Sequence, residues 1–519
     1  MSCNEDFILI YTIDIEDCDG EVLFMENALK IIKDPVLTYG QKVLALAKEA
    51  EDAIEVLNIS DRTKYYMENE VICDMFEGNA PYRPRYILPD YALLMDKGCS
   101  FLNLEAPTNI WEATHTLLMF YNHVPSITSY PVYLGNIDTL LEPFIEDEKE
   151  AEQAIRLFLT HIDRTITDSF CHANIGPLPT KAGNIILKVE RELKNAVPNI
   201  TLKVSDETTE QFLSEAVKTA LTVAKPSFAN HQAFAKDLGE QYGIASCYNG
   251  LYIGGGAYTL VRMNLAKLAM LADSKEAFMN SILEDAVKEM CSLMDERIGF
   301  LVEESGFFET HFLIKENFIM QDRFSAMFGL VGLAQSVNIL QEKEGLAGRF
   351  GHADEANLWG EEIIKKMESI IDAHSNPHCV VSDGKYLLHA QVGLDTDDNI
   401  SPGCRVPIGD EPELYQQISA EAPFHKYFPS GIGNIYPFEK TAYDNPKHVL
   451  DIMRGAFDIG MRYFSVYSSD SDVVRITGYL VKLSDIEKLR KNEQVVGNSV
   501  VLGMGAVDHQ HILEREVRK

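Results

Sequence analysis

Residues 468–483 read SSDSDVVRITGYLVKL, a polar turn followed by an apolar segment that contains a single glycine, Gly478. β-branched residues are frequent in this segment, so we expect an extended chain over 473–482. A lone glycine in a strand usually marks a bulge or a bend. The residues that flank Gly478 are Arg475, Ile476, Thr477 and Tyr479. This combination is more specific than a simple bend requires.

A second segment, residues 242–268, places one cysteine, Cys247, in an apolar loop that is followed by three glycines. It reads YGIASCYNGLYIGGGAYTLVRMNLAKL. Taken by itself, a cysteine in an apolar stretch is usually an inert core residue. The glycines at 254–256 lack the Lys-Ser or Lys-Thr of a phosphate-binding loop, and no G-x-G-x-x-G motif opens a helix. The usual nucleotide-binding motifs therefore give no indication of function.

Together the two segments resemble the glycine and cysteine loops of the glycyl radical enzymes, which include pyruvate formate-lyase and anaerobic ribonucleotide reductase. The resemblance implies that Gly478 stores a radical and that Cys247 passes it on as a thiyl. Glycine suits this role because a radical at Cα is planar and delocalised over the adjacent amide and carbonyl, and a side chain would crowd that plane. Arg475, Thr477 and Tyr479 are then expected to support the radical loop.

The resemblance runs from about residue 25 to the end and is closest to the YjjI family. The matching stretches are 71–91, 123–141, 172–177, 246–250, 409–412 and 475–485. The resemblance implies an α/β fold, a ten-stranded α/β barrel surrounded by helices. Its two finger loops would carry Cys247 and Gly478 to the centre.

The resemblance also implies how such a chain is activated. A separate activase that uses S-adenosylmethionine and a [4Fe-4S] cluster would install the radical, with no permanently bound cofactor or metal. The enzyme would work anaerobically on a small molecule, in the manner of pyruvate formate-lyase as an acyltransferase or lyase. Oxygen would cleave the activated chain at Gly478, and relatives suggest a homodimer.

Residue differences weaken the known subfamilies as models for the substrate. Pyruvate formate-lyase uses two adjacent cysteines, and here Ser246 precedes Cys247. Diol and choline-type eliminases place a glutamate base two residues after the cysteine, where this chain has Asn249, which takes no proton at neutral pH. Anaerobic ribonucleotide reductase carries a C-terminal four-cysteine zinc site, and no cysteine follows Cys404. Three alternatives stay open: a catalytically silent or spare-part protein, a ribonucleotide reductase-like activity, and a structural protein in which Gly478 is a bend.

Five polar residues in or near the matching segments are candidates for substrate binding. They are His123, Tyr133, His172, Asn249 and Arg405. A structural hydrogen bond is an equally good explanation for each. Arg405 is the strongest candidate for an anionic group because its guanidinium offers a planar, bidentate fork.

The composition is that of a soluble globular protein with a strongly acidic balance. The 46 Lys and Arg residues oppose 79 Asp and Glu residues, which gives a formal charge of −33. Such a field repels phosphate polymers and anionic lipid, so neither nucleic acid nor a membrane is an expected partner. No apolar run reaches the roughly 18 residues of a membrane span, and no export signal opens the chain.

The nine cysteines are scattered, and no C-x-x-C or H-E-x-x-H motif is present. We therefore expect reduced thiols, no metal site and a cytoplasmic location.

Helical and extended patterns alternate along the chain, which predicts an α/β protein with a mostly parallel sheet. The expected helices are 41–57, 147–166, 208–224, 273–302, 353–373 and 447–461, and the expected strands are 199–204, 386–392 and 473–482. No linker divides the chain, so we expect one domain over 25–519, with the radical loop region at about 445–485. Residues 1–24 are expected to be an atypical extension that a wrongly assigned start codon would explain.

Overall fold

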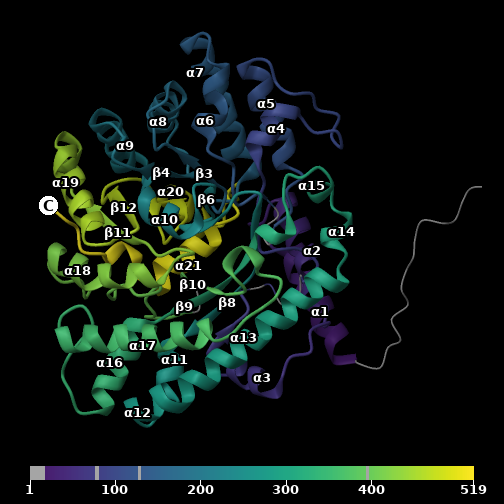
Figure 1. Cartoon of the computed structure of the whole chain (residues 1–519). Coiled ribbons are helices and arrows are strands. Elements are labelled where there is room, and N and C mark those ends of the chain that lie inside the picture. The colour runs from purple at the N-terminus through teal and green to yellow at the C-terminus, as the bar shows by residue number, and fades with distance from the viewer. Residues whose placement is uncertain (1–17, 76, 78–80, 127–129, 393–396) are drawn as a thin grey trace, which may run out of the picture.

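The fold is an α/β arrangement built on two five-stranded sheets (Figure 1). The computed structural model describes residues 18–75, 77, 81–126, 130–392 and 397–519. The first sheet contains β1 (Ile72–Cys73), β2 (Tyr86–Leu88), β8 (Gly255–Asn264), β9 (Phe324–Val331) and β10 (Leu387–Ala390). The second contains β3 (His172–Ile175), β4 (Asn199–Val204), β5 (Ser227–Asn230), β11 (Asn434–Phe438) and β12 (Tyr463–Ser468).

Of the eight strand pairs that the described residues form in the two sheets, five are parallel and three antiparallel, which agrees with the mostly parallel arrangement that the alternation of helix and strand predicts. In the first sheet β8, β9 and β10 run parallel, while β1 and β2 pair antiparallel with β8. In the second sheet β3, β4 and β5 run parallel, β5 pairs antiparallel with β12, and β11 runs parallel to β12. Every residue of β4, β8 and β9 is buried, as expected for strands that are covered on both faces.

Helices cover the outer faces of the two sheets (Figure 1). Those nearest the second sheet are α6 (Ile137–Leu141), α7 (Glu148–His161), α8 (Lys181–Leu193), α9 (Glu210–Val223) and α19 (Pro446–Asp458). Those nearest the first sheet are α11 (Leu265–Met270), α12 (Lys275–Ala277), α13 (Leu283–Gly299), α16 (Leu333–Lys343) and α17 (Asp354–Asp372). The others are α1 (Cys18–Lys33), α2 (Tyr39–Asp52), α3 (Asp61–Glu68), α4 (Tyr91–Lys97), α5 (Ile110–Tyr121), α10 (His231–Leu238), α14 (Phe307–Thr310), α15 (Phe312–Lys315), α18 (Leu414–Glu421), α20 (Leu483–Arg490) and α21 (Val500–His509).

Two helix expectations hold with slightly different bounds, and one strand expectation was wrong. The helix expected over 208–224 is α9, which begins at Glu210 because the Thr209 hydroxyl caps it by accepting from Phe212 N–H, whereas Thr208 donates its hydroxyl to the Pro177 carbonyl at 2.7 Å. The helix expected over 273–302 is confirmed as one continuous helical run that Ser274 caps: α12 continues through a π turn at Phe278–Ile282 into α13 and ends in a second π turn at Phe300–Glu304. The segment 473–482 is not one strand, because it turns back on itself at Gly478 and pairs with itself.

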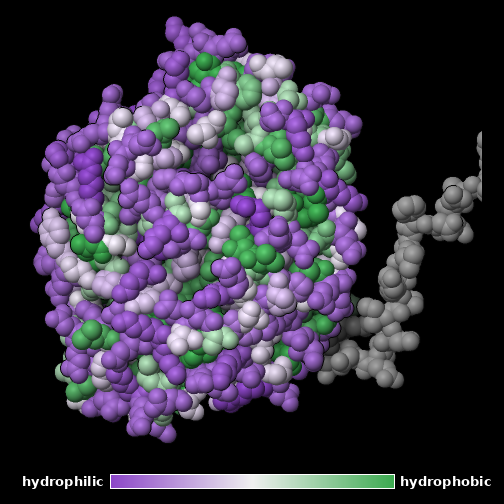
Figure 2. Space-filling view, in the orientation of Figure 1, coloured by the Kyte–Doolittle hydropathy of each residue, from purple (hydrophilic) through white to green (hydrophobic). Residues whose placement is uncertain are grey.

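The N-terminal division stays a prediction. Residue 25 lies inside α1, and residues 1–17 lie outside the described part of the chain. No helix among the described residues is long and apolar enough to cross a membrane. Seven cysteines are free thiols: Cys73, Cys99, Cys171, Cys247, Cys291, Cys379 and Cys404. One face of the molecule is predominantly hydrophilic, with apolar residues in small groups (Figure 2), as the acidic composition predicts.

Candidate functional site

The first part of the site is the cysteine hairpin, residues 242–252, formed by β6 (Tyr242–Ala245) and β7 (Asn249–Tyr252). Ala245 pairs with Asn249, so Ser246, Cys247 and Tyr248 make up its tip. Ser246 has φ +55°, a left-handed conformation that non-glycine residues seldom adopt. This turn places Cys247 at the end of the ribbon, where its side chain is 5% exposed.

The second part is the glycine hairpin, residues 473–482, formed by β13 (Val473–Arg475) and β14 (Leu480–Lys482). Arg475 pairs with Leu480, and the Ile476 N–H donates to the Tyr479 carbonyl at 3.0 Å to close the tip. Gly478 therefore lies at the end of a buried ribbon, as Cys247 does. Sequence analysis predicted both loops, but not that both are hairpins.

The two tips meet at Gly478 and Cys247. A Cβ atom added to Gly478 would lie 2.5 Å from the Cα of Cys247 and closer still to its Cβ and Sγ. Real Cβ atoms do not approach other heavy atoms so closely, so any side chain at 478 would displace Cys247. Gly478 has no left-handed φ. Glycine is therefore needed here for proximity to Cys247 and not for a special backbone angle.

Burial keeps Cys247 in its thiol form. Loss of water contact raises the pKa of the thiol to about 11, although the Ser246 hydroxyl and the charges of Arg475, Arg405 and Arg85 act to lower it. The Ser246 hydroxyl lies 3.9 Å from Sγ. At neutral pH the sulfur carries its hydrogen, which suits transfer of a hydrogen atom and disfavours chemistry that needs a thiolate.

Side chains hold the glycine hairpin in place from three directions. The Asn199 amide on β4 donates to the Gly478 carbonyl at 2.5 Å. The Arg475 guanidinium, which is fully buried, donates to Asn199 Oδ1 at 3.1 Å and to the Ala224 carbonyl at 2.6 Å. Arg515, near the C-terminus, donates to the carbonyls of Arg475 and Ile476. These contacts fix the backbone on both sides of Gly478.

The predicted support residues of the radical loop all lie at the tip. Arg475 acts as described above, and burial lowers the pKa of its guanidinium to about 10. The Tyr479 ring packs against Phe170, with ring centroids 4.9 Å apart. Thr477 is buried, and its hydroxyl finds no hydrogen-bond partner within the described part of the chain.

A hydrogen-bonded chain holds the tip of the cysteine hairpin. His172 Nδ1 lies 2.9 Å from the Ser246 carbonyl and its Nε2 lies 2.7 Å from the Thr201 hydroxyl. The Tyr463 hydroxyl lies 2.7 Å from the Thr201 hydroxyl and 3.3 Å from the Cys247 carbonyl. Burial lowers the pKa of His172 to about 3, so the ring is neutral. Nδ1 must then carry the proton, because a carbonyl can only accept.

Two of the five substrate-binding candidates lie beside Cys247 and have polar atoms without a hydrogen-bond partner among the described residues. Asn249 begins β7, and its Oδ1 is buried without a donor among the described residues. Arg405 Nε donates to the Gly433 carbonyl at 2.6 Å, and its guanidinium lies 5.6 Å from the centre of the Tyr248 ring. Arg405 Nη2 is buried without a hydrogen-bond partner among the described residues, and the nearby buried Glu421 carboxylate acts on the guanidinium without forming an ion pair with it.

The other three candidates have structural surroundings. His172 lies behind the cysteine tip and uses both ring nitrogens on protein atoms. Tyr133 is buried, and its ring packs against Gly243 of the cysteine hairpin. His123 is exposed, and its ring centre lies 6.5 Å from that of Phe312 on α15. The structure thus brings Asn249 and Arg405 to the tips, and places His123 on the surface.

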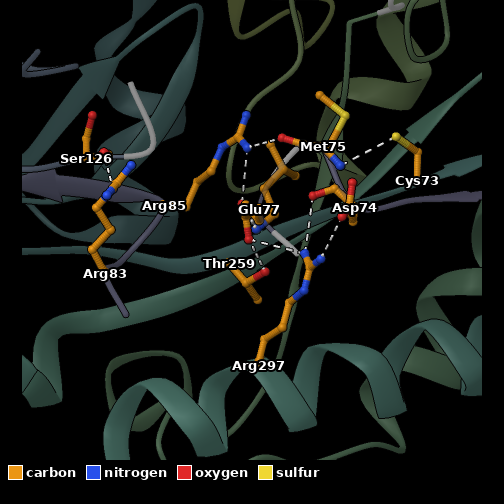
Figure 3. Close-up of polar contacts among 10 residues, drawn as sticks. Cys73, Asp74, Met75, Glu77, Arg83, Arg85, Ser126, Thr259 and Arg297 are labelled. Atoms are coloured by element: carbon orange, nitrogen blue, oxygen red, sulfur yellow. Dashed lines mark hydrogen bonds and ion pairs between the residues drawn. The ribbon is translucent and has the colours of Figure 1, made fainter. Parts of the chain in front are cut away.

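A buried ionic network joins the segment after β1 to β8 and α13 (Figure 3). Arg85 and Arg297 lie 3.3 and 3.4 Å from the Glu77 carboxylate, which also accepts from the Thr259 hydroxyl at 2.5 Å. Arg297 also lies 3.3 Å from Asp74. Burial raises the pKa of Glu77, and the two arginines oppose this shift. The network falls in the stretch 71–91 that the family resemblance singled out, but no residue of it was predicted as functional.

Sequence reasoning also missed the residues that hold the two tips. Asn199, Thr201 and Tyr463 lie on strands, and Arg515 lies in the C-terminal segment. The available signal was the polar residues at alternate positions of the otherwise apolar strand 199–204. Within the described residues, no group of three or more His, Cys, Asp or Glu side chains is placed to hold a metal ion.

Comparisons with known proteins agree with this geometry. A family model described as glycyl radical enzyme YjjI-like matches residues 37–518. An uncharacterized protein of Haemophilus influenzae is 44% identical over 501 residues, covering 95% of this chain and 98% of that protein. The Escherichia coli protein YjjI is 40% identical over 502 residues, with 95% and 97% covered.

Among solved structures, the anaerobic ribonucleotide reductase from Thermotoga maritima with glycerol in the active site aligns with a TM-score of 0.66 at 12% identity. The alignment covers 92% of this chain and 99% of that one. At this identity the likeness concerns the fold alone. The two five-stranded sheets are those of the ten-stranded α/β barrel type.

Proposed function

The chain belongs to the YjjI-like family of glycyl radical enzymes, and we propose that it stores a radical on Gly478 and uses it through Cys247. The observation that carries this proposal is the contact between the two hairpin tips, where no atom lies between the glycine and the cysteine side chain. A hydrogen atom can pass directly across such a contact. The thiol form of Cys247, with its pKa near 11, supplies the hydrogen that this exchange needs.

The proposed cycle balances in hydrogen atoms. The Cys247 S–H bond breaks and its hydrogen, with one electron, forms a Cα–H bond on the Gly478 radical. The thiyl then takes a hydrogen atom from a carbon of the substrate, which restores S–H and leaves a substrate radical. That radical eliminates or fragments, and the product radical takes the hydrogen back from Cys247. The thiyl that remains takes the Cα hydrogen of Gly478, which re-forms S–H and returns the radical to Gly478. Burial of both tips keeps water and oxygen from these intermediates.

A separate activase would create the radical by removing one hydrogen atom from Gly478. We propose that it is a radical S-adenosylmethionine enzyme with a [4Fe-4S] cluster, as in the rest of the family. Gly478 is enclosed by Cys247 and Asn199, so an external protein reaches it only when the glycine hairpin leaves its place. The hairpin is attached through side chains, which supports such a movement.

We propose that the substrate is a small molecule with an anionic group that binds Arg405. The supporting observation is a buried guanidinium that keeps one nitrogen without a hydrogen-bond partner among the described residues, and that feels the charge of the buried Glu421 carboxylate without forming an ion pair with it. A buried charge without a partner is costly, and a bound carboxylate or phosphate would remove that cost. Asn249 has a spare acceptor for a hydroxyl or amine of the same molecule. A lyase-type reaction fits this site better than acyl transfer, because Ser246 replaces the second cysteine.

The test is to incubate the protein with the activase without oxygen and record its electron spin resonance spectrum. We expect a doublet from the single remaining Cα hydrogen of Gly478. Gly478→Ala should abolish it, because the added methyl collides with Cys247. Gly455→Ala is the matched control, since a Cβ there meets nothing within 4 Å. Cys247→Ser should keep the doublet and lose all turnover. A wild-type protein that shows no doublet with a competent activase would contradict the proposal.

A further inference from the structure

One face of β4 reaches both hairpins. Alternate residues of a strand point to the same side, and here they are Asn199, Thr201 and Lys203. Asn199 donates to the Gly478 carbonyl, and Thr201 joins the chain that ends on the Cys247 carbonyl. Lys203 Nζ donates to the Tyr242 carbonyl at the base of the cysteine hairpin at 2.8 Å. A single rigid strand therefore sets the distance between the two tips.

Within this face, Asn199 is held in one orientation. Its side chain is fully buried, and its Oδ1 accepts from Arg475 at 3.1 Å and from the Ile200 N–H at 2.9 Å. The amide nitrogen must then point to the Gly478 carbonyl, because the reversed amide would place an acceptor against an acceptor. Arg475 polarises the amide through Oδ1 and so strengthens the Nδ2–H as a donor.

We propose that Asn199 is a positioning residue that stabilises the radical on Gly478 through the hydrogen bond to its carbonyl. This inference rests on the proposed function. A radical at Cα is shared between the amide nitrogen, which supplies electron density, and the carbonyl, which accepts it. A donor on the carbonyl oxygen strengthens the accepting half and holds the carbonyl in the plane of the radical. It also fixes the direction of the Cα–H bond toward Cys247.

This hydrogen bond affects the exchange of the radical between Gly478, which stores it, and Cys247, which relays it to the substrate. One hydrogen atom moves between the two residues. In one state Gly478 carries the radical and Cys247 is a thiol, and in the other Gly478 has its Cα–H bond and Cys247 is a thiyl. Asn199 favours the side with the radical on glycine. Without this hydrogen bond, the ratio of glycyl radical to thiyl should fall by roughly threefold to tenfold, the factor expected for one buried hydrogen bond. Because a thiyl is the more reactive radical, loss through this state should lower the yield of stored radical.

The first experiment uses wild-type protein only. It is activated with side-chain ¹⁵N-labelled asparagine incorporated, and its radical is examined by electron–nuclear double resonance. We expect a weak ¹⁵N coupling from the amide that donates to Gly478. A wild-type doublet with no ¹⁵N coupling would overturn the role of Asn199 while leaving the proposed function intact. Absence of the doublet itself would contradict the proposed function and the inference with it.

The second experiment compares two buried asparagines. Asn199→Ala should lose the ¹⁵N coupling, lower the radical yield and change the splitting of the doublet. Asn174→Ala is the matched control, because Asn174 is also fully buried but donates to the Ile244 carbonyl of the cysteine hairpin at 2.8 Å. It should keep the yield, splitting and coupling of the wild type. Equal yields and splittings in wild type and Asn199→Ala would overturn the inference.

Discussion

The cysteine hairpin and the glycine hairpin have the same construction but are attached to the protein differently. Both are buried antiparallel ribbons, and their tips carry the two residues of the proposed function, Cys247 and Gly478. The backbone of the cysteine hairpin bonds to the surrounding protein, from Ser246 N–H to the Val132 carbonyl and from Gly250 N–H to the Ser430 carbonyl, both at 2.9 Å. Among the described residues, the backbone bonds of the glycine tip, 476–479, stay within its own hairpin.

In the proposed function, this difference separates Cys247, the fixed relay of the radical, from Gly478, the site that stores it on a removable hairpin. Main-chain hydrogen bonds anchor Cys247 regardless of the side chains around it. The glycine hairpin depends on Asn199, Arg475 and Arg515, whose hydrogen bonds break individually. A ribbon held by side chains can leave its place while the rest of the fold stays intact, which suits a residue that another protein must modify.

The variant with the largest expected effect removes one of the side chains that hold the glycine hairpin. Arg515→Met should lower the free energy of opening the glycine hairpin by about 4 kcal/mol, since two hydrogen bonds from a charged donor are lost. Amide hydrogen exchange in 474–480 should accelerate roughly a thousandfold, while exchange in 242–252 stays unchanged. Arg518→Met is the control, because Arg518 donates to Pro412 and Gln417 and not to the hairpin. Equal protection of 474–480 in wild type and Arg515→Met would contradict the comparison.

The second test concerns the thiol proton of Cys247. The folded protein holds the Cys247 proton up to a pKa of about 11, whereas the thiol of the unfolded chain loses it near 9. The stability that this group provides is therefore complete below pH 9 and is lost as the pH rises from 9 to 11. It amounts to about 3 kcal/mol for two pKa units.

Because burial also raises the pKa of Cys291 and Cys379, the measurement must compare wild type with Cys247→Ser. Denaturant unfolding curves of the two proteins should diverge by this amount between pH 8 and pH 11. Parallel pH profiles would show that Cys247 titrates normally and is not enclosed as described.

The smallest effect is expected in the cysteine hairpin, because main-chain hydrogen bonds already anchor it. Tyr463→Phe removes one hydroxyl from the chain that ends at the Cys247 carbonyl, and should lower the free energy of unfolding by about 1 kcal/mol. Hydrogen exchange in 242–252 should increase no more than the global stability change requires. A selective loosening of this hairpin would show that side chains, and not the main chain, hold the relay.

The fold class and the family could be predicted from the sequence, and so could the two segments that carry Cys247 and Gly478. Cys247 and Gly478 lie in segments whose residues are specific over a short stretch, so local sequence is sufficient to find them. The family resemblance then supplied the barrel, which helix and strand periodicity alone indicated only as an α/β fold.

The residues that hold the tips could not be found in the same way. Asn199 lies 279 positions from Gly478, and nothing in the strand 199–204 indicates which buried residue will face a hairpin. Arg515 lies in a charged segment, where an arginine is more often a solvated surface residue. The reverse turn at Gly478 was missed because apolar residues on both sides of it read as one continuous strand.

The C-terminal segment has a consequence for a damaged molecule. The backbone of Arg518 forms a bridge with β11. Its N–H donates to the Pro437 carbonyl at 2.7 Å, and its carbonyl accepts from the Glu439 N–H at 2.8 Å. The Arg515 side chain donates hydrogen bonds to the carbonyls of Arg475 and Ile476, which precede Gly478, and β14 pairs with β13 across the turn. If oxygen severs the chain at Gly478, the piece from 479 to 519 therefore stays docked. The broken protein keeps its native size and shape, and separates into two polypeptides only in denaturant.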